Sequence, residues 1–354
     1  SGALITGNGS ITANGGNGVD IYSAGGGGGR IALYYDQKTY TGSLAAQGGC
    51  GTCTERGGAG TIYEKDHDEP RGALTIENSG AGEWTDIGTT YSLPSTLDNL
   101  RLNGSALVNL NSSSDLEVFS GSFKIPTSSS LYTNSNFRLN ETTAISIDGN
   151  LYQNSPMQAT GTTTMDISGQ LRLSNSYTFG SGSHITVENG GLLNTQDNTT
   201  TKQYYVDLDV EHFTVDTGGT VNLTGKGYTG GPARTTGNGP GAGIGGFADA
   251  GGAAYGGDGG DADAAGGDGY GSIILPVDLG SGGGGGHHRV GGAGGGHDRI
   301  TATGTMTING SIQNNGNAPT GGSDPSDKGG AGAGGSVLLS GALMTGTGTM
   351  TANG

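Results

Sequence analysis

The only two cysteines of the chain, Cys50 and Cys53, form a C-G-T-C motif inside a glycine-rich stretch. Such a pair could close a local disulfide, supply half of a zinc site or act as a redox couple. A zinc site needs a second pair of ligands at suitable spacing, and a redox couple needs a βαβ context; neither accompanies this motif. The motif therefore favours a local disulfide, which is typical of extracellular proteins, with free thiols as the alternative.

A second candidate site is the acidic stretch GGDGGDAD at 256–263. It resembles one calcium-binding nonapeptide repeat, in which Asp carboxylates and backbone carbonyls bind a hard cation. The motif occurs once, and Asp263 stands where that repeat has an aliphatic residue. We interpret Asp258, Asp261, Asp263 and Asp268 as a solvated acidic loop and keep calcium as a weak candidate. The sequence calls for no other cofactor.

Histidines and carboxylates give two further hypotheses. His287, His288 and His297 are close in sequence but match no zinc signature, so we expect solvent-facing loop side chains. Asp115, Asp148 and Asp166 each belong to a short β-prone segment, and a β-helix could stack carboxylates of this kind on one face. No Lys or Arg is evident at matching strand positions. The sequence therefore assigns no catalytic residue, and we expect no enzyme.

Sites of N-glycosylation are also encoded. Seven Asn residues start an N-x-S/T sequon: Asn8, Asn103, Asn111, Asn140, Asn198, Asn222 and Asn309. In an extracellular protein of a eukaryote, some of them would carry a glycan on the outer face.

Composition limits the class of protein. Glycine supplies 78 of 354 residues, about three times its usual share of roughly 7%, while charged residues fall to 13%. The net charge of -16 argues against nucleic acid, because phosphate binding depends on clustered Lys and Arg. No apolar run approaches the roughly 18 residues that would span a membrane. A modest supply of apolar residues suits a narrow core of stacked coils.

The organisation of the chain predicts an all-β fold. Short segments with alternating polarity end in Gly or Asn turns, and no 3.6-residue periodicity occurs. We divide the chain into a Gly-rich β-repeat segment at 1–69, a Ser/Thr/Asn-rich β-solenoid at 70–225 and a Gly-rich loop and β-repeat segment at 226–354. The recurring strands favour a right-handed parallel β-helix over a sandwich. For the densest glycine region, 230–296, two alternatives stay open: a disordered loop, or extended polyproline-II-like strands packed closely together.

The two ends of the chain share one sequence. Residues 340–354, SGALMTGTGTMTANG, repeat residues 1–15, SGALITGNGSITANG, at eleven of fifteen positions. Such ends suit head-to-tail contacts, which need not close into rings, or mark a segment cut from a longer repeat array. We predict a joint between the two segments, made by residues that recur in both: Ala3, Leu4, Ile5, Ile11, Ala342, Leu343, Met344 and Met350.

The order of glycine run, aliphatic strand, small strand and Asn-Gly turn, as in GGGGGRIALYYD at 25–36 and TANGGNG at 12–18, resembles the Gly-rich β-helical repeats of large secreted and cell-surface proteins. The resemblance implies a stalk, adhesin or appendage component, with mastigonemes as one such setting. We therefore expect an extracellular structural protein that stacks with copies of itself or with adjacent repeats of one precursor. The alternatives are an adhesin that binds glycans through Tyr34, Tyr35, Tyr204 and Tyr205, and a β-helix polysaccharide lyase or hydrolase.

Overall fold

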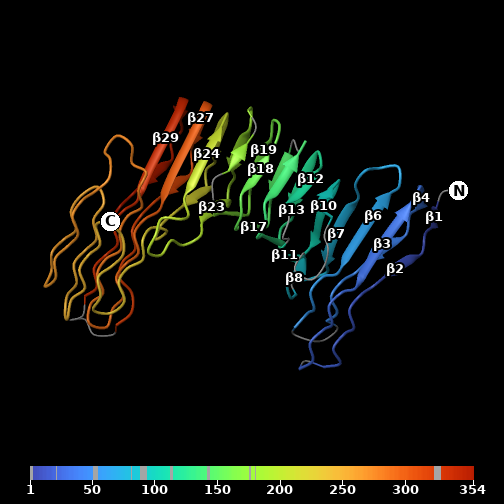
Figure 1. Ribbon diagram of the computed structural model, residues 1–354, viewed down its shortest axis with the longest axis horizontal. Helices are drawn as coiled ribbons and strands as arrows, with labels where there is room; N and C mark the ends of the chain where they lie inside the picture. The colour runs from blue at the N-terminus through green and yellow to red at the C-terminus, as the bar shows by residue number, and fades with distance from the viewer. Residues whose placement is uncertain are drawn as a thin grey trace. The chain divides into compact units, whose positions relative to one another are not determined.

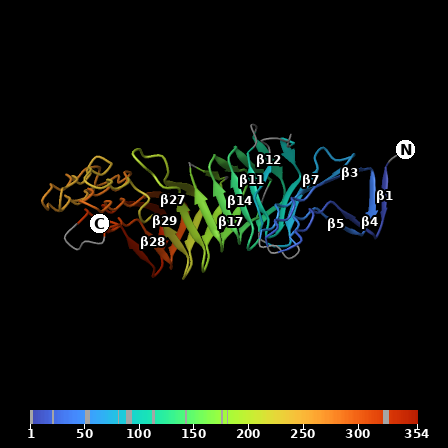
Figure 2. The ribbon, with the colours of Figure 1, turned by 90° about the horizontal axis from the view of Figure 1, so that it is seen from below.

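The computed structural model describes residues 3–20, 22–50, 55–80, 82–87, 94–111, 115–141, 144–174, 177–179, 181–322 and 328–354. Within these ranges every regular element is a β-strand (Figures 1 and 2). The all-β prediction is therefore confirmed. These ranges contain no helix, and therefore no helix that is long and apolar enough to cross a membrane.

The chain divides into two compact units, Ser1–Leu171 with Thr178–Ser183, and Arg172–Tyr177 with His184–Gly354. The first unit begins with a section of six strands. They are β1 (Leu4–Gly7), β2 (Ser10–Thr12), β3 (Arg30–Tyr35), β4 (Gln37–Tyr40), β5 (Ser43–Ala45) and β6 (Thr61–Asp66). Here β1 pairs with β4, β2 with β5 and β3 with β6, all in parallel. Each pair joins one coil to the next, as in a solenoid.

The rest of the first unit consists of shorter coils. Their strands are β7 (Ala73–Asn78), β8 (Thr85–Ile87), β9 (Thr96–Leu97), β10 (Asn99–Gly104), β11 (Leu107–Leu110), β12 (Leu116–Phe119), β13 (Ser122–Ile125), β14 (Ser130–Thr133), β15 (Phe137–Asn140), β16 (Ala144–Ile147), β17 (Asn150–Gln153), β18 (Met157–Ala159), β19 (Thr164–Ile167) and β21 (Thr178–Phe179); β20 (Gln170–Leu173) contains the boundary between the units. Parallel ladders run through them: β8-β11-β14-β17, β9-β12-β15-β18-β21 and β13-β16-β19, and β7 also pairs in parallel with β10. This is a solenoid-like parallel β arrangement.

Alternating sequences produce these coils because every second side chain of a strand points inward. In β15, Phe137 and Leu139 are buried, and Leu139 lies between Val118 and Ala159 of the adjacent coils. Outside this core, side-chain amides stack from coil to coil: Asn134 donates to Asn111, and Asn154 donates to Asn134 at 2.5 Å. Apolar columns inside and amide ladders outside therefore fix the register together.

Among the described strands, one pair is antiparallel, where β7 pairs with β6 and the strand direction reverses. Residues 69 and 70, the boundary that we placed between the first two segments, lie in the connection between these strands. Ile62 faces the core of the first section with Ile31, whereas its neighbour Tyr63 shares a face with Leu74, which is buried in the second section. The core thus changes to the other face of the sheet at the point where the strand direction reverses. Because both the direction and the core face change, the coils of the two sections wind in the same sense.

The second unit continues the coil plan. Its strands are β22 (His184–Val187), β23 (Leu192–Thr195), β24 (Val206–Val210), β25 (His212–Val215), β26 (Thr220–Asn222), β27 (His297–Ile308), β28 (Ser311–Gln313), β29 (Ser336–Thr345) and β30 (Thr349–Thr351). The long strand β27 pairs in parallel with both β24 and β25 on one side and with β29 on the other (Figure 1). The ladder β23-β26-β28-β30 completes the coils.

The glycine-rich region between β26 and β27 is ordered as a bundle of extended segments that contains no strands. Its central segment, Gly280–Gly286, is fully enclosed. Backbone hydrogen bonds connect it to six surrounding segments, at 228–231, 234–238, 243–246, around Gly251, 292–295 and 330–333. A Cβ on Gly283 would lie 2.1 Å from the carbonyl oxygen of Gly330. Only glycine permits this packing.

Candidate functional site

The predicted joint residues at the start of the chain lie in and next to β1 and β2. Leu4 and Ile5 belong to β1, which pairs only with β4, and Ile11 belongs to β2, which pairs only with β5, among the described residues. Ala3 precedes β1 and accepts backbone hydrogen bonds through its carbonyl oxygen. Leu4 is 56% exposed, whereas Ile11 packs against the apolar cluster of the first section.

The matching residues of the other segment lie in β29 and β30, which are edge strands among the described residues. Met344 in β29 pairs with Met306, and Met350 in β30 pairs with Ile312. Met306 and Ile312 are completely buried, whereas Met344 is 46% and Met350 52% exposed. In each of these two columns, the residue on the edge strand is about half exposed while its partner on the preceding strand is buried. Ala342 and Leu343 are also exposed.

The cysteine prediction falls partly outside the described residues. Cys50 is buried, and its backbone N–H donates to Asn17 Oδ1 at 2.9 Å. Cys53 lies in 51–54, outside the described ranges. The disulfide therefore stays a prediction.

The acidic loop uses part of its carboxylates locally. Asp258 Oδ1 accepts the backbone N–H of Gly269, and Asp261 Oδ1 accepts that of Gly266, each at 2.8 Å. All four Asp residues are exposed. They do not form a set of three ligand atoms close enough to share an ion, although the structure describes all of them. Calcium at this loop stays a weak candidate.

Two of the loop histidines lie together, and the third is elsewhere. The rings of His287 and His288 are 3.8 Å apart between centroids. His297 instead begins β27, is 2% exposed and shares a hydrogen bond of 2.9 Å with the Ser336 hydroxyl. The expectation of a solvent-facing His297 was wrong, because β29 covers the strand that follows the glycine run. Burial lowers the pKa of His297 to about 3, so its imidazole is neutral.

Of the three carboxylates that we expected in strands, only Asp166 lies in one, β19, whereas Asp115 precedes β12 and Asp148 follows β16. These two have basic partners, contrary to our expectation. Lys124 Nζ lies 2.6 Å from Asp148 Oδ2, and Arg138 Nη2 lies 3.4 Å from Asp115 Oδ2. The Lys124 ammonium is the main reason why the pKa of Asp148 is lowered. Sequence inspection missed these pairs because the partners are 23 or 24 positions apart, a separation that becomes adjacent only once the coils stack. Ion pairs of this kind fit the outer face of a coil, and no catalytic role follows from them.

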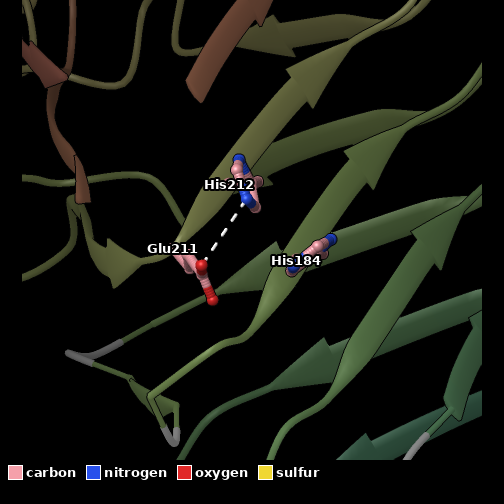
Figure 3. Close-up of side chains that lie close together, drawn as sticks. All are labelled: His184, Glu211 and His212. Atoms are coloured by element: carbon pink, nitrogen blue, oxygen red, sulfur yellow. Dashed lines mark ion pairs between the residues drawn. The ribbon is translucent and has the colours of Figure 1, made fainter. Parts of the chain in front are cut away.

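Among the described residues, one group of three side chains could bind a metal ion: His184, Glu211 and His212 (Figure 3). Their ligand atoms all lie within 4.8 Å of one another. His184 and His212 are register partners of β22 and β25, with ring centroids 4.4 Å apart. Sequence reasoning missed the cluster, although both strands visibly begin with His, in HITV and HFTV.

The hydrogen bonding of His212 opposes metal binding. Its Nδ1 accepts the backbone N–H of Thr305 at 3.0 Å, so the proton of a neutral ring is on Nε2, which lies 3.7 Å from Glu211 Oε1. A metal on Nε2 would displace that proton and place an Nδ1–H against the Thr305 N–H. We assign His212 a structural role instead, because Thr305 lies where the pairing of β27 with β29 shifts register.

The sequons differ in access. Asn198 is 1% exposed, and its Nδ2 donates to the carbonyl oxygens of Tyr204 and Lys226, each at 2.7 Å. This arrangement has no room for a glycan. Asn8 and Asn103 are exposed, and Asn111, Asn140, Asn222 and Asn309 are partly exposed. Glycosylation at these six positions stays a prediction.

Comparisons of the chain with protein-family models, with curated proteins and with solved structures found no match. The functional argument therefore depends on the residues and contacts described above.

Proposed function

We propose that the chain is an extracellular structural protein whose coils stack end on end, so that it forms or belongs to a surface filament or appendage. The observation that carries this proposal is the same contrast in two ladders, β27-β29 and β28-β30. Met306 and Ile312 are covered by the next coil, whereas Met344 and Met350 present the same inward-facing columns partly exposed. An uncovered strand edge with apolar residues favours addition of a further strand.

The coil that best fits against the exposed edge of β29 and β30 is one with the sequence of residues 1–15, which resembles that of residues 340–354. Aligning 340–354 on 1–15 places Met344 on Ile5 and Met350 on Ile11. Ile11 pairs with Leu44, so one apolar column continues across the joint, whereas Ile5 pairs with Lys38. The same alignment places Thr349 on Ser10, two outward-facing positions. The added coil comes from a second copy or from an adjacent repeat of a longer precursor. In either case the solenoid lengthens without new types of contact.

The glycine bundle supports a mechanical role. Residues three apart in the central segment donate backbone hydrogen bonds to the same neighbouring segment. Gly280 and Gly283 donate to the segment 292–295, and Gly282 and Gly285 donate to the segment 234–238. A polyproline-II helix has three residues per turn, so polyproline-II-type packing is the conformation we propose for these segments. Together with coils wound as a right-handed β-helix, it would give a stiff unit built largely from backbone hydrogen bonds.

Electron microscopy of the purified 354-residue chain tests the assembly. We expect filaments, and we expect Met350→Lys to abolish them, because it places a charge inside the joint. Thr349→Lys, one residue away on the outward face, is the matched control and should leave them intact. A chain with Ser10→Cys and Thr349→Cys should form disulfide-linked multimers on oxidation, while each single variant and the unaltered chain should not. Monodisperse particles at high concentration, or equal assembly by both Lys variants, would contradict the proposed joint.

A further inference from the structure

Asparagine followed by glycine occurs nine times in the chain. Asparagine is chemically labile in proteins, and it loses ammonia most readily when glycine follows it. In that reaction the glycine backbone nitrogen attacks the side-chain carbonyl carbon of asparagine, and glycine has no side chain to obstruct the attack. A fold suppresses the reaction wherever hydrogen bonds hold both groups. The structure therefore decides which of these pairs can react.

Two of the pairs have the same local sequence and equivalent places in their coils. They are Asn8-Gly9-Ser10, in the turn between β1 and β2, and Asn309-Gly310-Ser311, in the turn between β27 and β28. Each turn leads into the short strand of its coil. The tripeptide alone would give the two asparagines the same reactivity, so any difference between them comes from their surroundings.

Hydrogen bonds to both adjacent coils hold the pair at Asn309. The Gly310 N–H donates to the Val215 carbonyl oxygen in the preceding coil at 3.0 Å. Asn309 Oδ1 accepts the Thr347 N–H of the following coil at 3.4 Å, and Asn309 is partly buried. Attack of the Gly310 nitrogen on the Asn309 side chain would require both hydrogen bonds to break.

The pair at Asn8 lacks this protection. Asn8 and Gly9 are exposed, and among the described residues neither the Asn8 side chain nor the Gly9 N–H has a hydrogen-bond partner. The Gly9 carbonyl oxygen does accept the Tyr40 hydroxyl at 2.5 Å and the Ser43 N–H at 3.2 Å. The turn is thus held on one side, while the nitrogen that would attack remains free.

The preceding coil accounts for this difference. The two ends of the chain repeat one sequence, and their turns share a backbone conformation, with Gly7 at φ 124° and Gly346 at φ 125°. In the second of these turns Gly348, the counterpart of Gly9, donates its N–H to the Ile308 carbonyl oxygen of the preceding coil at 2.8 Å. No described coil precedes β1 and β2, so the Gly9 N–H has no equivalent acceptor.

We propose that Asn8 is a site of spontaneous deamidation in the unassembled chain. The Gly9 nitrogen bonds to Asn8 Cγ, the Cγ–Nδ2 bond breaks, and ammonia leaves with the proton of the Gly9 N–H. Water then opens the resulting succinimide ring to aspartate or isoaspartate. Either product adds a negative charge between β1 and β2, and isoaspartate also adds a methylene group to the main chain there.

Stacking of copies would protect Asn8, and this part of the inference rests on the function proposed above. Thr307 pairs with Thr345, so Gly346 is the counterpart of Ile308 in the next coil. When β29 and β30 of one copy cover β1 and β2 of another, the Gly346 carbonyl oxygen accepts the Gly9 N–H. Assembled chains then keep Asn8, whereas unassembled chains progressively alter the surface that forms the joint.

The test uses the full chain with Met350→Lys, which should not assemble, produced in bacteria so that no glycan occupies Asn8. After incubation in mildly alkaline buffer, peptide mass spectrometry measures conversion at each Asn-Gly pair. Asn8 should react at least about tenfold faster than Asn309, since two hydrogen bonds must break before Asn309 reacts. Gly9→Ala should slow the reaction at Asn8 several-fold and leave the fold intact, because no atom lies within 4 Å of the new Cβ.

Equal rates at Asn8 and Asn309, or a Gly9→Ala chain that reacts at Asn8 as fast as its parent, would overturn the inference. In filaments of the unaltered chain, Asn8 should react as slowly as Asn309. Reaction at the rate of the Met350→Lys chain would refute protection by the joint. Microscopy detects filaments independently, so rapid reaction at Asn8 in a chain that never assembles would refute the proposed assembly and leave the deamidation site in place.

Discussion

The coils from β12 to β19 and the glycine bundle around Gly280–Gly286 are both stacks of extended chain, but different groups hold them together. In the coils, inward side chains such as Leu139 and Ile145 form buried columns, and backbone ladders run along the stack. In the bundle, six segments enclose a seventh that carries one side chain, Ser281. The coils exclude water with hydrocarbon, whereas the bundle does so with backbone alone.

This difference determines what each region tolerates. A side-chain core can repack around a change of shape, and swaps that keep volume usually cost less than about 1.5 kcal/mol. A bundle in which backbone meets backbone has no flexible atoms to move. We therefore expect the glycine bundle to respond to the smallest possible addition, one methyl group, more strongly than the coils respond to the loss of several.

The largest expected effect is that of Gly283→Ala. Its Cβ would lie 2.1 Å from the Gly330 carbonyl oxygen, closer than any real contact, so at least two segments must separate. We expect a loss of more than about 3 kcal/mol, the upper part of the range for overpacking. Amide hydrogen exchange of 280–286 should show the opening. The control is Gly256→Ala, where no atom lies within 4 Å of the new Cβ and where exchange should stay slow. Equal protection in both variants would contradict backbone-to-backbone packing.

The coil counterpart is Leu139→Ala. Leu139 is completely buried between Val118 and Ala159, so its truncation should cost about 3 kcal/mol in the free energy of unfolding by urea. Leu139→Met, which keeps most of the volume, should cost less than about 1.5 kcal/mol. If Leu139→Met is as damaging as Gly283→Ala, the contrast between the regions is incorrect.

Sequence reasoning succeeded where local pattern determines structure and failed where distant coils meet. Alternation and Asn-Gly turns were sufficient to predict β-strands such as β22, HITV at 184–187. The partner of Asp148 could not be predicted in this way, because Lys124 reaches it only through the register Lys124–Ser146 of β13 and β16. The order of the glycine region also depends on six separate segments, which no local pattern contains.

The dependence of stability on pH involves two adjacent residues of β27, where the coils meet the bundle. Asp298 is completely buried, occupies a column between Val206 and Val337, and accepts Asn314 Nδ2 at 2.9 Å, while its Oδ2 has no hydrogen-bond partner among the described residues. Burial raises the pKa of Asp298 to about 7. Burial, and then the positive charge of Lys202, lowers the pKa of the neighbouring His297 to about 3.

These two shifts act in opposite directions on stability. Between pH 4 and 6.5, the folded chain keeps a proton on Asp298 that the unfolded chain has lost, so stability falls as pH rises. Over the same range the unfolded chain carries a proton on His297 that the folded chain lacks, so stability rises with pH. The slopes cancel in the unaltered chain. Asp298→Asn removes the first and should leave stability rising by about 1.4 kcal/mol per pH unit, whereas His297→Asn removes the second and should leave it falling as steeply.

Urea unfolding at several pH values measures these slopes, and all other titrating groups contribute equally to the three proteins. A packing defect in either variant would offset its whole curve without changing the slope, so the sign of the slope is the decisive result. Parallel curves for the three proteins would mean that the folded chain lets water reach β27. In that case the glycine bundle would not seal the coil beside it, and backbone packing would be the less effective of the two ways to exclude water.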